Sequence, residues 1–224
     1  MVHSSASIRL VILGGEGSGV IVAESVAALR AAGNDVALLG FLNDAVAAGA
    51  AIGGVPVLGR FDEWSRVPRD AQFLAAFPSA RQAQARHERL RALGIPPERW
   101  GRVVDPRARV AATSRIGRGS FVAPYAVVEP GAEIAAYSIV RGGAYVSHDV
   151  RLGEFGFVGP NATLLGRSRF GTGVHIGANS VCRDGVTVGD YALIGIGSVV
   201  VRDVAPYTVV AGNPARLLEH HVAR

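Results

Sequence analysis

The second half of the chain repeats every six residues. From Val110 to Val200, an apolar residue stands at every sixth position without a slip. Four residues after each of these positions, as far as Ser198, the chain has a small or β-branched residue. A helix repeats about every 3.6 residues and a strand every second residue, so neither explains a strict period of six. The repeat therefore predicts a solenoid of short strands and corners.

Three of the six-residue units would form one coil of this solenoid. Each unit places one aliphatic and one small side chain inward, and so makes a short strand and a corner. Coils of about 18 residues then stack at the usual strand spacing of about 4.8 Å. The repeat is long enough for about five coils, and it predicts a parallel β-helix over 106–202 and a C-terminal tail at 203–224. The spacing alone does not fix the hand of the coil.

Residues 1–105 have the pattern of a small α/β domain. The apolar runs at 8–13 and 35–42 predict buried strands. The stretch at 19–33 between them predicts a helix that ends at its last glycine. Strand, helix and strand in this order form a βαβ unit, so we expect a small Rossmann-like parallel sheet.

A further strand and a second helix follow in the same domain. The apolar run at 71–77 predicts the strand, and the stretch at 79–94 predicts the helix. Ser79 is the candidate N-cap of this helix, and Gly94 is the candidate stop.

Composition limits the function classes. The chain has no lysine, which excludes a Schiff-base lysine and the lysine of a phosphate-binding P-loop. The formal net charge is +5, but the arginines are scattered and form no basic block, so we expect no nucleic-acid partner. Arginine also binds the phosphate groups of small ligands through its planar fork of donors.

The sequence gives no signal for export or for membrane insertion. The apolar run near the N-terminus is too short for a signal peptide, and no stretch reaches about 18 unbroken apolar residues. The lone Cys182 cannot form a disulfide within the chain. We therefore expect a soluble, cytoplasmic protein.

Three features of the chain resemble the left-handed β-helix acyltransferases. They are the hexapeptide array, the phrase "AGNPAR" after its last unit, and "ILGGEGSG" at the start of the α/β domain. Over its whole length the chain is similar to the nucleotide-sugar N-acetyltransferase and sialic acid O-acetyltransferase group related to UDP-N-acetylbacillosamine N-acetyltransferase. The resemblance implies a left-handed coil, acetyl transfer from acetyl-CoA, and a homotrimer with active sites between neighbouring solenoids.

The pair His148–Asp149 interrupts the array at one corner. Gly166 follows His148 by 18 residues, so it should lie one coil above it, leave room for a ligand and offer a backbone N–H to a thioester carbonyl. Histidine suits a general base because its unperturbed pKa, about 6.5, lies near neutral pH. We therefore predict that His148 is the base and that Asp149 orients its ring or favours its charged form. The resembling group has its proposed base in a phrase similar to "SHDVRLGEF".

Ala178 and Ile196 are also 18 residues apart, in the phrases "GANS" and "GIGS". Corner residues on successive coils would line a shallow groove along the solenoid, which suits the extended pantetheine arm of a coenzyme. The resemblance implies that both positions, together with Gly166, contact coenzyme A.

The glycine-rich loop before the first helix predicts a phosphate site. Gly17, Ser18 and Gly19 lie where that helix begins, and helix N-termini bind phosphate groups. The loop does not have the G-x-G-x-x-G spacing, so we expect no redox dinucleotide. The resemblance implies that Asn43 and Asp44, in "FLND" after the second strand, contact the ribose or the uracil of a UDP-linked sugar.

The chain departs from the resembling group at three positions. It has Ser18 where the group usually has a histidine, Arg141 where the group often has an asparagine, and Phe157 where the group has a second histidine. In the group these positions shape the acceptor side of the site. We therefore expect the donor chemistry to be shared and the acceptor sugar to be unusual.

Together these observations favour an enzyme that moves acetyl from acetyl-CoA to the amino group of a nucleotide-linked sugar. O-acetylation of a sugar hydroxyl and a catalytically inactive nucleotide-sugar-binding solenoid are the alternatives. A metalloenzyme of the γ-carbonic anhydrase type would need about three histidine ligands. The solenoid offers His148 and His175, whose separation of 27 residues is not a multiple of 18, so we expect no metal.

Overall fold

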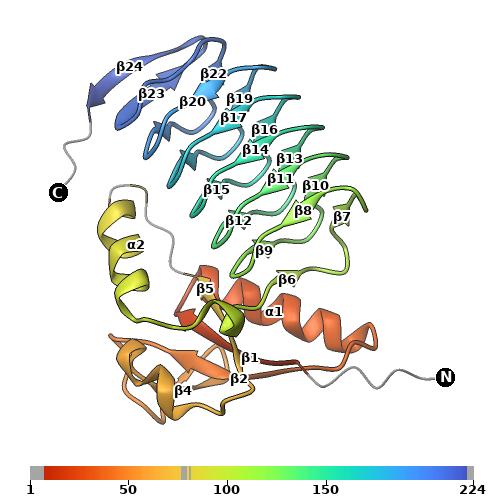
Figure 1. Cartoon of the computed structure of the whole chain (residues 1–224), viewed down its shortest axis with the longest axis vertical. Coiled ribbons are helices and arrows are strands. Elements are labelled where there is room, and N and C mark those ends of the chain that lie inside the picture. The colour runs from red at the N-terminus through yellow and green to blue at the C-terminus, as the bar shows by residue number, and fades with distance from the viewer. Residues whose placement is uncertain (1–7, 77–79, 81, 221–224) are drawn as a thin grey trace.

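The computed structural model describes residues 8–76, Ala80 and 82–220. Figure 1 shows an α/β domain at one end of the molecule and a stack of coils that rises from it. The predicted N-cap Ser79 lies outside the described residues. Within them, no helix has the length and apolar character that a membrane crossing requires.

The α/β domain contains one sheet, two α-helices and two short 3-10 helices. Its elements are β1 (Ile8–Gly14), α1 (Ser18–Ala31), β2 (Val36–Leu42), β3 (Ala51–Ile52), β4 (Val55–Gly59), η1 (Phe61–Arg66), β5 (Gln72–Ala76), α2 (Ala83–Ala92) and η2 (Pro97–Arg99). The strand order is β3-β4-β2-β1-β5, and all neighbours are parallel except β3 and β4. The predicted parallel sheet is confirmed, but the β3–β4 hairpin was not predicted.

Each helix ends two residues before the predicted glycine, at Ala31 and at Ala92. The N–H of Gly33 donates to Arg30 O at 3.0 Å, and the N–H of Gly94 donates to Arg91 O at 3.1 Å. Gly33 has φ +87° and Gly94 has φ +65°. Side chains with a Cβ are disfavoured in this left-handed conformation, which explains why glycine stands at both stops.

The rest of the chain is a parallel β-helix of two-residue strands with two longer strands at its far end. The strands are β6 (Val103–Val104), β7 (Arg109–Val110), β8 (Arg115–Ile116), β9 (Phe121–Val122), β10 (Val127–Val128), β11 (Glu133–Ile134), β12 (Ile139–Val140), β13 (Tyr145–Val146), β14 (Arg151–Leu152), β15 (Phe157–Val158), β16 (Thr163–Leu164), β17 (Arg169–Phe170), β18 (His175–Ile176), β19 (Val181–Cys182), β20 (Thr187–Val188), β21 (Leu193–Ile194), β22 (Val199–Val200), β23 (Thr208–Gly212) and β24 (Ala215–His220). β23 pairs with β21 and with β24, so the region expected as a tail adds two strands to the solenoid.

The short strands form three sheets, and each strand pairs with the third strand along the chain. Val146 of β13, for example, is the partner of Leu164 of β16, which stands 18 residues later. The predicted coil length is therefore confirmed. β6 pairs with β9, so the ladder starts at Val103, slightly before the boundary expected at 106.

The interior of the coils contains the side chains that the repeat predicts to point inward. Val146 and Leu164 are fully buried, and so are Val150 and Ser168, four positions after each of them. Serine fits inside because its hydroxyl finds a partner: Ser168 Oγ donates to a backbone carbonyl oxygen at 2.6 Å. The double register of large and small residues thus builds a continuous core.

Three kinds of corner join the sheets, and each is named after one of its residues. The Arg141 corner comprises 141–144, the His148 corner 147–150 and the Phe155 corner 153–156, with their equivalents in the other coils. The third residue of each corner has a left-handed backbone, such as Asp149 with φ +58°. Side chains at this position point away from the core, so the corners can carry functional groups.

The two domains share a core. Val22 and Val26 of α1 lie in one apolar cluster with Phe121 of β9 and Ile139 of β12. α2 lies beside the coils on the other side of the sheet (Figure 1) and contacts the Phe155 corner. The α/β domain is therefore packed directly on the solenoid through both helices.

Removal of an inward side chain should leave a cavity in a coil. Ile194 is fully buried, and we expect Ile194→Ala to lower the free energy of unfolding by about 2–5 kcal/mol. Ile8, which is 48% exposed, provides the matched control, and Ile8→Ala should change it by no more than about 0.5 kcal/mol. Urea unfolding followed by circular dichroism measures both. Equal losses in the two variants would contradict the packing described above.

Candidate active site

His148 and Asp149 form a dyad at the His148 corner. An oxygen of the Asp149 carboxylate lies 3.0 Å from Nδ1 of His148. A hydrogen bond from Nδ1–H to this carboxylate leaves Nε2 as the nitrogen that can accept a proton. The imidazole is half-buried and the carboxylate is exposed, so a ligand can reach both. The geometry suits a general base with an orienting partner.

Glycines in the neighbouring coils make room for the dyad. A Cβ atom on Gly166, one coil above, would lie 2.5 Å from Nε2 of His148. A Cβ atom on Gly131, one coil below, would overlap with Oδ1 of Asp149. The backbone N–H of Gly166 has no acceptor among the described residues. The predicted stacking of Gly166 on His148 is thus present, while Gly131 was missed although the spacing of 18 also identifies it.

A second carboxylate, which sequence reasoning missed, supports this corner from one coil below. Glu129 accepts hydrogen bonds from the Tyr145 hydroxyl and from Ser147 Oγ, the latter at 3.1 Å. The bond from Tyr145 is the main cause that lowers the pKa of the Glu129 carboxyl, and the backbone N–H of His148 contributes as well. Glu129 precedes Ser147 by 18 residues, which is the signal that could have found it.

A pocket of about 680 Å³ lies where β1 and β2 end. Its lining comes from the glycine-rich loop, the loop after β2, and α2, and includes Gly15, Asn43, Asp44, Arg86 and Arg89. In open parallel sheets, ligands bind at the carboxyl ends of the strands. Two arginines at the rim suit phosphate groups, so the pocket has the size and the charge that a nucleotide requires.

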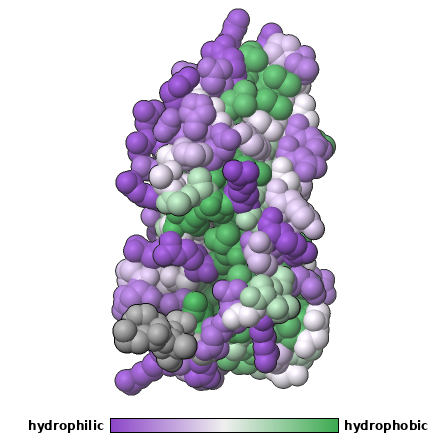
Figure 2. All heavy atoms as spheres, turned by 90° about the vertical axis from the view of Figure 1, so that its right-hand side faces the viewer, coloured by the Kyte–Doolittle hydropathy of each residue, from purple (hydrophilic) through white to green (hydrophobic). Residues whose placement is uncertain are grey.

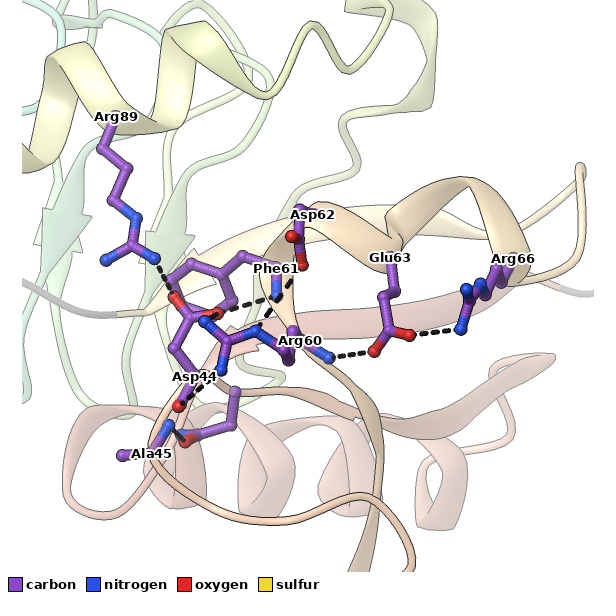
Figure 3. Close-up of polar contacts among 9 residues, drawn as sticks. Asp44, Ala45, Arg60, Phe61, Asp62, Glu63, Arg66 and Arg89 are labelled. Atoms are coloured by element: carbon purple, nitrogen blue, oxygen red, sulfur yellow. Dashed lines mark hydrogen bonds and ion pairs between the residues drawn. The ribbon is translucent and has the colours of Figure 1, made fainter.

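Asp44, in the loop after β2, contacts both α2 and the start of η1 at the edge of this pocket (Figure 3). Its carboxylate pairs with Arg89 of α2, lies 3.8 Å from Nη2 of Arg60, and accepts the N–H of Phe61 at 3.1 Å, where η1 begins. The Asp44 side chain is only 20% exposed. Asp44 therefore fixes α2 and η1 around the pocket, and its contact with a ribose or a base stays a prediction.

Asn43 holds the glycine-rich loop in place. Its Nδ2 donates to Gly14 O at 2.8 Å, and its Oδ1 accepts the N–H groups of Ala45 and Val46, both at 2.8 Å. A Cβ atom on Gly15 would lie 2.5 Å from Nδ2 of Asn43, so this close approach requires glycine. Asn43 lines the pocket as expected, with one amide hydrogen left for a ligand.

The predicted loop glycines have different surroundings. Gly17 precedes α1 with φ +73°, and a Cβ atom there would meet open space. Gly19 is buried, and a Cβ atom on it would lie 2.9 Å from the ring of Phe41. Gly19 therefore allows α1 to pack closely on β2, whereas Gly17 lies open at the start of the helix.

Ser18 and Arg141, two of the positions that depart from the resembling group, contact each other. Arg141 Nη1 donates to Ser18 Oγ at 3.0 Å, although 123 positions separate them in the sequence. Arg141 is half-buried, and burial lowers the pKa of its guanidinium. It borders a groove of about 440 Å³ with Ile21 of α1 and Pro160. The pair joins the start of α1 to the Arg141 corner.

Phe157, the third departing position, stacks on His175 in the next coil. The ring centroids are 4.4 Å apart and the planes differ by 12°. Burial lowers the pKa of His175 to about 4. One face of the Phe157 ring is thus covered, and its contact with a substrate stays a prediction. Within the described residues, no group of three histidine, cysteine, aspartate or glutamate side chains is placed to hold a metal ion.

The candidate residues of the solenoid lie at two different corners. Gly166 belongs to the His148 corner, whereas Ala178 and Ile196 belong to the Arg141 corner. The N–H of Gly197 donates to Ala178 O at 2.8 Å, so the coils of Ala178 and Ile196 are stacked as predicted. Ile196 is 81% exposed. A single chain therefore does not bring Gly166 to the same corner as the other two residues.

Comparison with solved structures identifies the family. The chain is 33% identical to the acetyltransferase domain of PglB from Neisseria gonorrhoeae FA1090, with a TM-score of 0.82, over 94% of this chain and 99% of that domain. It is 29% identical to PerB from Caulobacter crescentus in complex with CoA and GDP-perosamine, with a TM-score of 0.79, over 96% of this chain and 99% of PerB. The chain belongs to the nucleotide-sugar N-acetyltransferases of the left-handed β-helix family. The predicted fold class is thereby confirmed.

Curated sequences align with this chain over shorter segments. The dTDP-3-amino-3,6-dideoxy-alpha-D-galactopyranose 3-N-acetyltransferase of Aneurinibacillus thermoaerophilus is 49% identical over 53 residues, which are 24% of this chain and 28% of that protein. The chain thus spans about a quarter of the length of the first curated relatives it matches. No family model matches the chain.

Acid should weaken the fold through His175. An unfolded histidine has a pKa of about 6.5, and burial lowers the pKa of His175 to about 4, so the unfolded chain gains a proton first as the pH falls. We expect this contribution to stability to be complete above about pH 6.5 and to be lost as the pH falls towards about 4. His175→Phe keeps a ring against Phe157 and should reduce the loss. Urea unfolding at about pH 7 and about pH 4.5 tests this, and an unchanged acid loss in the variant would contradict it.

Proposed function

We propose that this protein transfers the acetyl group of acetyl-CoA to the amino group of a nucleotide-linked amino sugar. The observation that carries the proposal is the His148–Asp149 dyad beneath Gly166, in a chain that aligns over 94% of its length with an acetyltransferase domain. Further support comes from the complex of that domain with acetyl coenzyme A and from the complex of PerB with CoA and GDP-perosamine.

In the proposed reaction, His148 is the general base. Its Nε2 accepts a proton from the amine while the amine nitrogen attacks the thioester carbonyl carbon, and Asp149 holds the ring and balances its charge. The carbonyl oxygen becomes negatively charged in this step, and the backbone N–H of Gly166 donates to it. The carbon–sulfur bond then breaks, and coenzyme A leaves as a thiolate that takes up a proton.

The nucleotide is proposed to occupy the pocket of about 680 Å³ at the ends of β1 and β2. Its phosphates would face the arginines of α2 and the start of α1 at Gly17, Ser18 and Gly19, and its ribose or base would face Asn43 and Asp44. The names of relatives include GDP, dTDP and UDP, so the preference for UDP stays a prediction. The reaction is proposed to take place in the cytoplasm, where acetyl-CoA is available.

In this proposal a complete site needs two chains. The dyad and Gly166 occupy the His148 corner, whereas Ala178, Ile196 and the Ser18–Arg141 pair belong to the Arg141 corner. A cyclic homotrimer sets one of these corners against the other between neighbouring solenoids. An apolar strip on one face of the molecule supports such an assembly (Figure 2). So do the half-buried outward residues of the sheet that runs from β7 to β22, which are Val127, Tyr145, Thr163, Val181 and Val199.

Release of free thiol from acetyl-CoA, measured with UDP-, GDP- and dTDP-linked amino sugars, tests the proposed function directly. Release with a 4-amino or 3-amino sugar, and none with the matching hydroxy sugar, is the expected result. Release with hydroxy sugars alone would favour O-acetylation. Binding of a nucleotide sugar without any release would favour an inactive sugar-binding solenoid.

Loss of the base should affect turnover and leave donor binding intact. We expect His148→Ala to lower kcat by about a hundredfold to ten-thousandfold and to keep the affinity for acetyl-CoA within about twofold. Asp149→Asn should cost less, because it weakens the orientation of the ring without deleting the base. Asp190→Asn, the same charge change at the Phe155 corner, is the control. In the wild type, kcat/KM should fall on the acid side, and persistence of that fall in His148→Ala would mean that the base lies elsewhere.

The mass of the protein in solution tests the two-chain site. We expect light scattering to give about three times the chain mass of 23.2 kDa at micromolar concentration. Val181→Arg places a charge on the outward face of β19 and should shift the protein towards monomer, with a parallel loss of activity. A fully active species at 23.2 kDa would rule out a site shared between chains.

A further inference from the structure

Aromatic side chains form a ladder along the Phe155 corner. Tyr137, Phe155, Tyr191 and Tyr207 occupy the left-handed position of four of the coils, with φ between 54° and 61°. The rings of Tyr137 and Phe155 stack at 4.8 Å, and those of Tyr191 and Tyr207 stack at 5.4 Å. Gly173, with φ +67°, takes the place between Phe155 and Tyr191. The ladder therefore lacks one side chain.

A ring from the α/β domain fills this gap. His87 of α2 stacks on Phe155 with a centroid distance of 4.1 Å and an angle of 16°, and its ring lies 5.7 Å from that of Tyr191. A Cβ atom on Gly173 would overlap with the ring of Tyr191 and would lie 3.2 Å from Cε1 of His87. The rings of Tyr191 and His87 together fill the space beside Gly173, and the imidazole stands between Phe155 and Tyr191.

The imidazole of His87 behaves as an apolar ring. Burial, and to a lesser degree the charge of Arg91, lowers the pKa of His87 to about 4, so the ring is neutral at physiological pH. Its buried Nδ1 has no hydrogen-bond partner among the described residues. Among the described residues, His87 is therefore held by ring packing in the ladder and not by a hydrogen bond.

The two faces of α2 serve two different parts of the molecule. His87, Leu90 and Arg91 lie against the solenoid, where Arg91 pairs with Glu154 at 3.2 Å and covers the ring of Phe155 at 4.9 Å. The opposite face borders the pocket at the ends of β1 and β2 through Gln82, Ala85, Arg86 and Arg89. Residues three or four positions apart lie on the same face of a helix, so the two sets lie on different faces of α2.

We propose that His87 is a positioning residue for the nucleotide pocket. By filling the gap at Gly173 it anchors α2 on the β-helix, and α2 in turn holds Arg86 and Arg89 over the pocket. α2 has only 10 residues, and a helix this short depends on tertiary contacts for its place. The inference rests on the proposed function, in which this pocket binds the nucleotide of the acceptor.

The first test compares two substitutions of the ring. His87→Ala should speed amide hydrogen exchange in α2 and lower the affinity for UDP, GDP or dTDP, whichever the wild type binds, by roughly threefold to tenfold. His87→Phe restores a ring and should return both quantities to within about twofold of the wild type. The affinity for acetyl-CoA, measured by calorimetry in the same samples, should not change in either variant.

The second test fills the gap from the solenoid side. Gly173→Tyr places a tyrosine at the position that Tyr137 and Tyr191 occupy in other coils, with a similar left-handed backbone, and it requires the Tyr191 ring beside Gly173 to shift. The new ring should displace His87, and we expect faster exchange in α2 and weaker nucleotide binding, with donor affinity unchanged.

Two results would overturn the inference. The first is amide hydrogen exchange in α2 that stays as slow as in the wild type in both Gly173→Tyr and His87→Ala. The second is an unchanged nucleotide affinity in a variant whose α2 exchanges faster than in the wild type. A wild-type protein that binds none of the three nucleotides would instead overturn the proposed function, and the inference with it. The wild-type titration therefore distinguishes the two failures.

Discussion

Backbone hydrogen bonds between coils set the position of every functional group in the solenoid. Each short strand pairs in parallel with the strand 18 residues later, as Val146 does with Leu164. Residues one period apart therefore lie about 4.8 Å apart along the stack. The dyad below Gly166, the support of Ser147 by Glu129, and the stacking of Phe157 on His175 are all consequences of this one spacing. The geometry of the candidate active site therefore follows from the 18-residue length of a coil.

Missing Cβ atoms then decide where side chains from elsewhere can fit. Gly131 leaves room for the Asp149 carboxylate, Gly166 for the His148 imidazole, and Gly173 for the rings of Tyr191 and of His87 from the α/β domain. In each case the neighbouring coils carry larger residues at the same corner, so glycine is not required by the backbone alone. At Gly173 the left-handed conformation is one that tyrosine and phenylalanine tolerate in other coils. The rings of Tyr191 and His87, which fill the space beside Gly173, explain the absence of a side chain there.

The sequence predicts what depends on the period and misses what depends on packing between distant segments. The coils, their inward residues, and the placement of Gly166 over His148 follow from counting, and the structure confirms them. Counting the repeat along the sequence could not reveal that Ser18 contacts Arg141, 123 positions away. It also could not reveal that Asp44 pairs with Arg60 and Arg89. The β3–β4 hairpin escaped prediction because its strands are too short to show a periodic pattern.

The acetyl-donor side of the candidate site depends on the repeat, whereas the acceptor side depends on packing between distant segments. The groups assigned to acetyl transfer stand on the stacked coils of the β-helix. The core of these coils tolerates little change because inward residues such as Val146 and Leu164 are fully buried. The groups assigned to the acceptor lie at the junction of two domains, where the Ser18–Arg141 pair, Phe157 and α2 meet the corners of the solenoid. Substitutions at that junction alter contacts between domains without altering the stacking of coils. Acceptor selectivity can therefore diverge within this fold while the proposed base, the carboxylate beside it and the glycine above them stay in place.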